Sequence, residues 1–386
     1  MTNAALFKHR LNEIISKPSV SCTLASHDMS NLDAIHVIAT WLDDLGFDTE
    51  IQPLPDGKAN LIACLGEGSG GLVLSGHSDT VPFDDSRWQS DPFKVEEKDN
   101  RYYGLGSCDM KAYFPVIISA IEALALKKED LKHPLIVLAT ADEESSMSGA
   151  RALVKESLHN ARYAIIGEPT GLVPIRMHKG IAMERIRVTG KAGHSSNPNL
   201  GNNALEAMHE VIGEMLNFRS ELQTRYQHPG FTVAEPTMNL GCIHGGDNPN
   251  RICGRCELDF DIRPLPGMSI DQINTELSKR LAGIAARTQT QLELEPLFEH
   301  VDPFEQQPQT EIVKMSERLS GHAAESVAFA TEAPFLAQLG MQTIVMGPGS
   351  IDQAHQPNEY LEHDQIQPAI DIIKAAIVEC CLEQGP

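Results

Sequence analysis

Basic residues are scarce in this sequence of 386 residues. Lysine and arginine together number 31 against 53 aspartates and glutamates, which leaves a formal net charge of -22 at pH 7. A surface of this sign repels polyanions such as nucleic acids and anionic membranes. The composition therefore argues against either of them as a partner, whereas divalent metal ions and small cationic ligands remain compatible with it.

Long apolar runs are also lacking. The N-terminal stretch has apolar residues at helical spacing, with charges between them, and does not read as an apolar signal segment. Nothing later approaches the roughly 18 or more apolar residues of a membrane helix. We therefore expect a soluble chain without a cleaved leader.

Cysteines are few and scattered. There are eight, and only Cys253 and Cys256 have a suggestive spacing. No second cysteine or histidine pair accompanies them, and they lie in an alternating segment, 251–263, that is typical of a strand, so a metal or redox role is disfavoured. Scattered thiols in a long chain are typical of a reducing compartment, so we expect the protein in the cytoplasm.

Two patterns alternate in the first half of the chain. Short apolar runs closed by small residues predict buried strands, and helical stretches separate them. The strands are expected at 59–64, 71–76, 134–140 and 162–167, with helices at 111–127 and 146–157. The same pattern resumes near the C-terminus, with a helix at 312–319, a strand at 342–346 and a helix at 365–380. We predict an α/β fold whose mainly parallel sheet has helices on both faces.

The pattern changes between these two parts. From residue 181 to residue 298 it runs strand, helix, strand, strand, helix, strand, which is the order of a ferredoxin-like α+β unit. The length of the chain also favours two domains over one. We expect a discontinuous catalytic domain, residues 1–179 and 299–386, and an inserted domain, residues 180–298. An exposed sheet edge or helical face of the insert would pair two chains into a homodimer.

Polar clusters follow the predicted strands. His77 and Asp79 come after one strand, Glu143 and Glu144 after another, and Glu168 and His355 after two more. Ends of parallel strands form the ligand crevice of such sheets, so these side chains should converge. Each cluster alone has an ordinary explanation, such as a hydrogen-bonded turn or a solvated acidic loop. Together they favour a shared site.

Individual positions suggest individual roles. Asp79, two residues after His77, can accept the second ring proton of that histidine. Asp109 lies where a glycine turn meets a helix. The alternatives there are a helix cap, or a nucleotide loop that lacks its third glycine. Paired metal ions need a shared ligand, and a carboxylate such as Asp109 suits that position.

The chemistry expected from this set is metal-assisted hydrolysis. The carboxylates of Asp109, Glu144 and Glu168 would offset most of the charge of two Zn²⁺ ions, so the cluster can be buried. Adjacent side chains at a strand end point in different directions, which leaves Glu143 free as general base beside the metal ligand Glu144.

Several motifs resemble the cocatalytic zinc peptidase and aminoacylase superfamily, which has a zinc-exopeptidase-like fold. They are Ser75-Gly-His-Ser-Asp-Thr-Val-Pro82, Gly106-Ser-Cys-Asp-Met-Lys111, Ala141-Asp-Glu-Glu144 and Gly167-Glu-Pro-Thr170. The resemblance covers nearly the whole chain. It implies two metal sites that share Asp109, one completed by His77 and Glu168 and the other by Glu144 and His355.

The resemblance extends to catalysis and substrate binding. It implies Glu143 as base and Asp79 as the group that orients His77. It further implies that His194 of the insert stabilises the tetrahedral oxyanion with help from Asn250, and that Arg263 holds the substrate carboxylate. Zinc is the implied metal, with cobalt or manganese as substitutes.

Later motifs are most similar to the branch that deacetylates N2-acetyl-L-ornithine. They include His244-Gly-Gly-Asp247, Asp261-Ile-Arg-Pro-Leu-Pro-Gly267 and Gly347-Pro-Gly-Ser-Ile-Asp-Gln-Ala-His-Gln-Pro357. The expected substrate is a small N-acyl amino acid, and Glu332 is a candidate for contacting the ornithine ammonium. The alternatives are desuccinylation of succinyl-diaminopimelate, dipeptide hydrolysis, or a non-catalytic protein that binds acylated amino acids.

Overall fold

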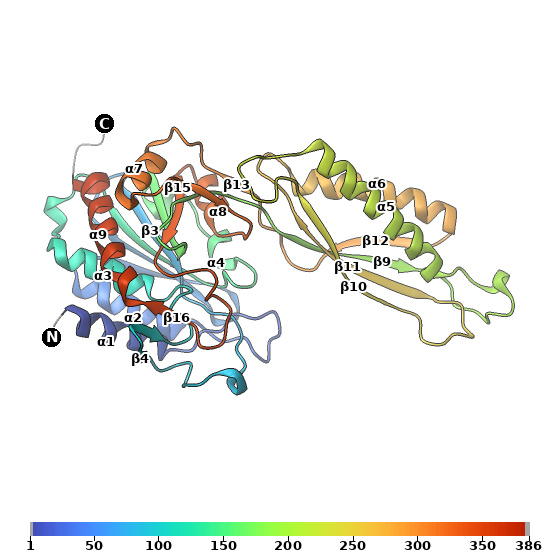
Figure 1. Cartoon of the computed structure of the whole chain (residues 1–386), viewed down its shortest axis with the longest axis horizontal. Helices are drawn as coiled ribbons and strands as arrows, with labels where there is room; N and C mark the ends of the chain where they lie inside the picture. Colours follow the sequence, from blue (N-terminus) through green and yellow to red (C-terminus); the bar gives the residue numbers. More distant parts are fainter. Residues whose placement is uncertain (1–2, 383–386) are drawn as a thin grey trace. The chain divides into compact units, whose positions relative to one another are not determined.

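The computed structural model describes residues 3–382, and the chain falls into two compact units. Of the described residues, the large unit comprises 3–176, 306–325 and 332–382. The inserted unit comprises Met177–Glu305 and Ser326–Thr331. Figure 1 shows both, and each is described by itself below.

The large unit is built on a sheet whose centre is parallel. The full strand order is β1-β2-β6-β3-β7-β15-β8-β13, with β14 beside β8; the last two residues of β8, all of β13 and most of β14 belong to the residues of the inserted unit. The four central strands pair in parallel, as predicted; they are β6 (Leu135–Thr140), β3 (Leu72–His77), β7 (Tyr163–Pro169) and β15 (Gln342–Gly347). The strands on either side pair antiparallel: β1 (Asp48–Pro53) and β2 (Ala59–Leu65) at one edge, and β8 (Ile175–His178) and β13 (Phe304–Glu305) at the other. Strand β14 (Glu325–Val327) pairs with β8.

Helices cover both faces of this sheet, which confirms the predicted fold class. One core contains alternate strand residues, such as Leu72 and Leu74, together with apolar side chains of five helices. These are α1 (Asn3–Ile15), α2 (Leu32–Asp44), α3 (Tyr113–Leu124), α7 (Glu311–Ser320) and α9 (Ile366–Ile377). Val73 is buried on the opposite side, and α8 (Ala333–Gln338) packs against β15 and α4 (Ser148–Arg151) outside that core. Burial on both faces explains why the strands read as continuous apolar runs.

The helix predicted at 146–157 is wrong for most of its length. Only the short α4 and a single 3-10 turn at Glu156–Leu158 form there. The chain turns tightly after β6, where the backbone N–H of Met147 donates to Asp142, and Gly149 then lies against strand β6's end. Gly149 lies inside α4, and a Cβ there would come within 2.5 Å of the Ala141 nitrogen, so only glycine lets α4 approach the end of β6 this closely.

The large unit also contains a small antiparallel sheet of three strands. It consists of β4 (Glu96–Lys98), β5 (Arg101–Tyr103) and β16 (Tyr360–Glu362). Tyr360 of β16 faces Tyr103 of β5 across the ladder. Throughout residues 3–382, no helix has both the length and the apolar character that crossing a membrane requires.

The inserted unit has an antiparallel sheet with both helices on one face. The strand order is β10-β11-β9-β12, and the chain runs through it in the β-α-β-β-α-β order of a ferredoxin-like unit. Its elements are β9 (Ala182–Thr189), α5 (Ala204–Arg225), β10 (Thr237–Gly245), β11 (Arg255–Arg263), α6 (Ile270–Thr288) and β12 (Gln291–Pro296). The strand expected from residue 251 begins only at Arg255, and Cys253 and Cys256 are buried free thiols.

Candidate metal centre

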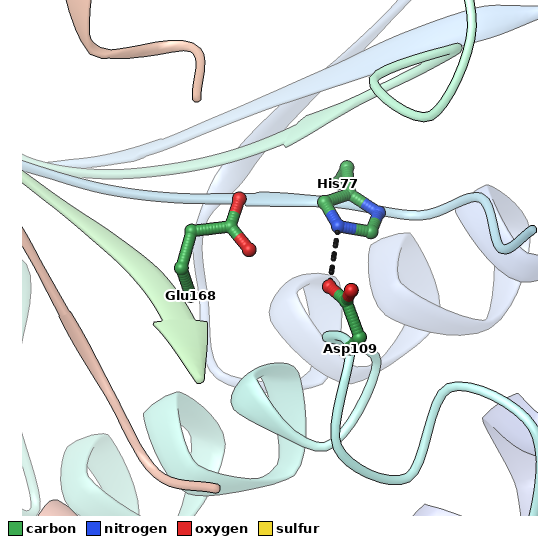
Figure 2. Close-up of side chains that lie close together, drawn as sticks. All are labelled: His77, Asp109 and Glu168. Atoms are coloured by element: carbon green, nitrogen blue, oxygen red, sulfur yellow. Dashed lines mark hydrogen bonds and ion pairs between the residues drawn. The ribbon is translucent and has the colours of Figure 1, made fainter. Parts of the chain in front are cut away.

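The strand ends of the large unit bring the polar clusters together. His77 is the last residue of β3, Glu168 lies near the end of β7, and the glutamate pair follows β6. In one group, ligand atoms of His77, Asp109 and Glu168 lie within 4.8 Å of one another (Figure 2). A second group, at the same limit of 4.8 Å, contains Asp109, Glu144 and His355.

Asp109 belongs to both groups. Its Oδ1 lies 3.1 Å from Nε2 of His77, and its Oδ2 lies 3.5 Å from Nε2 of His355. The two oxygens of one carboxylate thus face two different imidazoles. This is the arrangement that a carboxylate shared by two metal ions requires.

The two glutamates after β6 have different neighbours. Glu144 lies 3.0 Å from Nε2 of His355 through its Oε2. Glu143 makes a third close group with His77 and Glu144, in which ligand atoms are within 4.8 Å. Glu143 is absent from the two groups that share Asp109, so it borders the centre without being needed to complete either group.

The electrostatics of these residues favour a bound cation. Burial raises the pKa of Glu168 and of Glu143 well above the usual range, and the neighbouring carboxylates raise both further. Glu168 Oε1 is buried and, among the described residues, has no hydrogen-bond partner. Divalent ions would neutralise this cluster and occupy that oxygen, so the donor set fits two of them, with mixed nitrogen and oxygen ligands.

The imidazoles of His77 and His355 supply positive charge to the carboxylate cluster. Hydrogen bonds to Asp109 and Glu144 raise the pKa of His355 to about 10. The pKa of His77 is also raised: burial opposes its protonation, but the hydrogen bond to Asp109 and the charges of the nearby carboxylates together outweigh burial. Metal ligation needs neutral imidazole, so metal ions would displace these protons.

Asp79 orients His77 through a different atom from the one expected. Nδ1 of His77 lies 3.1 Å from the backbone carbonyl oxygen of Asp79, whereas the Asp79 carboxylate is 3.7 Å away. That carboxylate instead accepts a hydrogen bond from the backbone N–H of Glu144, at 3.1 Å. The chain leaves the strand after His77, so the pleat that would stack the two side chains ends there. Asp79 therefore links His77 to the glutamate loop.

Three supporting residues escaped the sequence reasoning or received little weight in it. Lys58, 4% exposed, forms ion pairs with Asp28 and with Asp142, the residue before Glu143. Glu359, 1% exposed, accepts three backbone hydrogen bonds from the loop of Asp109. Glu332 is buried, and its charge adds to those that raise the pKa of Glu143 and Glu168. No sequence pattern marked Lys58, and Glu359 was visible only as an acidic residue four positions after His355.

The remaining predicted residues lie in the inserted unit. The turn that carries His194 pairs with the segment around Asn250: the N–H of Ser195 donates to the Asn250 carbonyl at 3.0 Å, and His194 forms a bridge with Arg251. His194 and Asn250 are both exposed. Arg263, at the end of β11, donates from Nε to Asp261 at 3.0 Å. The structure thus brings His194 and Asn250 together and places Arg263 at the end of a strand.

Curated proteins resemble this chain along almost its full length. Acetylornithine deacetylase of Vibrio campbellii is 50% identical over 368 residues, which cover 95% of this chain and 97% of that protein. Acetylornithine deacetylase of Proteus mirabilis is 47% identical over 374 residues, or 96% of each chain.

Solved structures share the fold at lower identity. Aminopeptidase PepT from Bacillus cereus has a TM-score of 0.76 at 20% identity, with 98% of each chain covered. The YXEP protein of Bacillus subtilis, described as a dinuclear metal-binding peptidase, has a TM-score of 0.69 at 16% identity, with 98% of this chain and 99% of that chain covered. The model of peptidase family M20/M25/M40 matches residues 73–379. This chain belongs to peptidase family M20/M25/M40.

Proposed function

We propose that this chain hydrolyses the acetyl amide of N2-acetyl-L-ornithine to acetate and L-ornithine, with two zinc ions in its metal centre. The observation that carries the proposal is the pair of ligand groups joined by Asp109, with an acidic side chain, Glu143, next to them. The substrate follows from the names of relatives that are up to 50% identical to this chain.

Each ligand has a place in this proposal. His77 and Glu168 would hold one ion, Glu144 and His355 would hold the other, and Asp109 would serve as a ligand to both. When bound, the ions supply Lewis-acid chemistry, because they polarise the amide carbonyl and ease deprotonation of water. Cobalt or manganese would support the same chemistry with the same ligands.

Glu143 moves the proton. Its carboxylate lies beside His77 and Glu144, with ligand atoms within 4.8 Å of one another, so it can reach a water molecule at the centre. It takes a proton from the attacking water and delivers it to the departing nitrogen of ornithine. Asp79 assists from behind by keeping His77 and the loop of Glu144 in place.

The inserted unit supplies substrate contacts and the subunit interface in this proposal. His194 and Asn250 stabilise the tetrahedral oxyanion, and Arg263 releases Asp261 to clamp the substrate carboxylate. Two chains associate through the insert: β10 is an edge strand whose Ile243 is 49% exposed, and α5 exposes Leu205. The eight cysteines are free thiols, in keeping with a cytoplasmic enzyme.

A substrate panel tests the proposal. Purified protein is assayed with acetylornithine, acetylmethionine, succinyl-diaminopimelate and simple dipeptides, before and after removal of metal by a chelator. We expect acetylornithine to be preferred, activity to vanish with the metal, and zinc to restore it. Turnover that survives full removal of metal would refute the metal mechanism. A preference for the succinylated substrate would refute the assigned substrate but keep the reaction class.

A further inference from the structure

We propose that Glu359 is a positioning residue that holds the backbone of Asp109 where its carboxylate can serve both metal ions. The proposal rests on the function proposed above and adds a residue to its machinery. Glu359 does not belong to any of the close ligand groups, and it is 1% exposed. Its influence on the centre would be exerted through the loop that it binds.

The carboxylate of Glu359 collects three backbone donors from one loop. Oε1 accepts from the N–H of Cys108 at 2.7 Å and from the N–H of Asp109 at 2.9 Å. Oε2 accepts from the N–H of Gly106 at 3.0 Å. Both oxygens are thus used, and one donor belongs to Asp109 itself.

The loop is shaped so that these N–H groups converge. Gly106 has φ +83°, in the left-handed region where a side chain would be strained. Successive N–H groups that point into one concavity form an anion site in a backbone turn. Here a side chain of the same chain occupies that concavity. The backbone carbonyl of Glu359 also accepts from the N–H of Gly104, at 3.1 Å, so the contact extends to the start of the loop.

The same segment carries the other half of the centre. His355 lies four residues before Glu359, and β16 begins at the next residue, Tyr360. The Asn358 side chain accepts from the N–H of Gln89 at 2.7 Å, which ties this segment to a third part of the chain. Glu359 therefore fixes the Asp109 loop directly against the segment that supplies His355. Asp109 and His355 belong to the same ligand group, the one that also contains Glu144.

This geometry predicts what removal of the clamp does. Without it, the Asp109 carboxylate would no longer be held between His77 and His355, and both metal sites would lose a fixed ligand. Loss of a partner that orients a ligand typically costs about 10- to 100-fold in metal affinity. If Glu359 served only the stability of the loop, the folded variant would bind metal as tightly as the wild type.

The test compares three variants of the full-length protein. Glu359→Gln keeps the shape but turns an amide NH₂ group toward backbone donors, and Glu359→Asp keeps the carboxyl group but is too short to reach all three. Glu362→Gln is the matched control: it lies three residues away, and its carboxylate pairs with Arg101 at 3.0 Å on the surface. Zinc affinity is measured by competition with a chromogenic chelator, and the visible absorption of the cobalt-loaded protein reports ligand geometry. Far-ultraviolet circular dichroism reports folding.

We expect Glu359→Gln to lose about 10- to 100-fold in zinc affinity, with a changed cobalt spectrum. At saturating zinc its kcat should fall while KM changes little, because Asp109 acts in the reaction and not in holding the acyl amino acid. Glu359→Asp should lose less affinity than Glu359→Gln, and Glu362→Gln should match the wild type. Folded Glu359→Gln or Glu359→Asp with wild-type zinc affinity would overturn the proposal. The measurement of zinc affinity needs no substrate, so the two proposals can fail separately. Wild-type protein that binds zinc but does not hydrolyse acetylornithine would refute only the assigned function.

Discussion

The two units of this chain handle charge in opposite ways. In the large unit, acidic side chains gather at the buried ends of parallel strands, where burial raises the pKa of Glu143 and Glu168 and the charges of Glu144 and Glu332 raise both further. In the inserted unit, charges lie on the sheet face that the helices leave open and pair with one another. There Arg185 lies 2.6 Å from Asp259, and Arg187 lies 2.8 Å from Glu257.

The difference separates a reactive site from a surface. Charges that neutralise one another in reach of water need no further partner, and each pair is worth at most about 1 kcal/mol. Carboxylates that share a buried pocket repel one another and need an external cation or protons. The location of uncompensated charge thus marks the large unit as the one that holds metal. Four predictions test this contrast, from the largest expected effect to the smallest.

The strongest test concerns the glutamate pair after β6. Glu143→Gln removes the proposed base and leaves both ligand groups around Asp109 complete. We expect kcat to fall about 1,000-fold, since positioned acid–base groups typically contribute between 100-fold and 10,000-fold. Zinc content, measured by elemental analysis, should stay at the wild-type level. Glu144→Gln is the matched control and should lose zinc as well as activity. If Glu143→Gln loses the metal instead, the division of work between the two glutamates is reversed.

The second prediction concerns Lys58, a buried basic residue of the large unit. Nζ of Lys58 lies 2.7 Å from Asp28 and 2.8 Å from Asp142. Lys58→Met removes the shared counterion, so the free energy of unfolding should fall by about 3 kcal/mol. The only two tryptophans, Trp41 and Trp88, both lie in the large unit, so their fluorescence during urea unfolding reports on that unit.

An exposed lysine provides the control for this substitution. Lys128 pairs with Glu67 at 3.1 Å, and its side chain is 46% exposed. Lys128→Met should change the free energy of unfolding by less than about 0.5 kcal/mol. Equal losses in the two variants would show that burial does not set the strength of ion pairing in this unit.

The third prediction places a buried titratable group in the inserted unit. His178 is fully buried; its Nδ1 lies 2.9 Å from the Lys179 carbonyl oxygen, and its Nε2 lies 3.1 Å from the Thr331 hydroxyl. Burial lowers the pKa of His178 from 6.5 to about 4. Between pH 6.5 and about pH 4, the unfolded chain therefore binds a proton at His178 that the folded chain does not bind. The stability of this unit should be fully present above pH 6.5 and be lost as the pH falls, by about 2 kcal/mol at pH 5.

Amide hydrogen exchange of the β9 strand measures this loss. His178→Gln cannot titrate, so the difference between its stability and that of the wild type should shrink as the pH falls from 7.5 to 5. Replacement of the exposed His209 of α5 by glutamine should leave the pH dependence of the wild type unchanged. A constant difference between wild type and His178→Gln across this range would contradict a buried neutral His178.

The parts of this molecule that the sequence predicted are those with a local signal. His77 and Glu168 each follow an apolar run, and such runs become the central parallel strands wherever both sheet faces are covered. The polar β1, in which every residue is exposed or half-buried, gave no such signal, so β1 was not predicted, although its antiparallel partner β2 was expected at 59–64. Of the helix expected at 146–157 only α4 forms, and the hydrogen bond of the Gly149 N–H to Ala141, which fixes where α4 lies, is tertiary and leaves no local signal.

Support for the centre was hidden for the same reason. Glu359 binds the backbone of Asp109, which lies 250 positions away in the chain. The spacing of residues near Glu359 carries no trace of that contact. The atom of Asp79 that faces His77 likewise depends on where strand β3 ends and on the hydrogen bond that the Glu144 N–H donates to the Asp79 carboxylate. Candidate metal ligands can be recognised in the sequence by residue type. The groups that hold them in place depend on contacts that exist only in the folded chain.

The smallest expected effect belongs to the open face of the inserted sheet. Arg187 lies 2.8 Å from Glu257 and 2.6 Å from Glu295, and its side chain is 24% exposed. Arg187→Met leaves two carboxylates that water can reach, so the stability measured by hydrogen exchange of β9 and β11 should fall by less than about 1 kcal/mol. The difference should shrink further at about 1 M salt, where charges are screened within roughly 3 Å. Arg255→Met, at a side chain that is 61% exposed on the same Glu257, should cost less still. A loss as large as that of Lys58→Met would mean that the ion pairs of Arg187 behave like buried ones. The contrast between the two units would then rest on the metal centre alone.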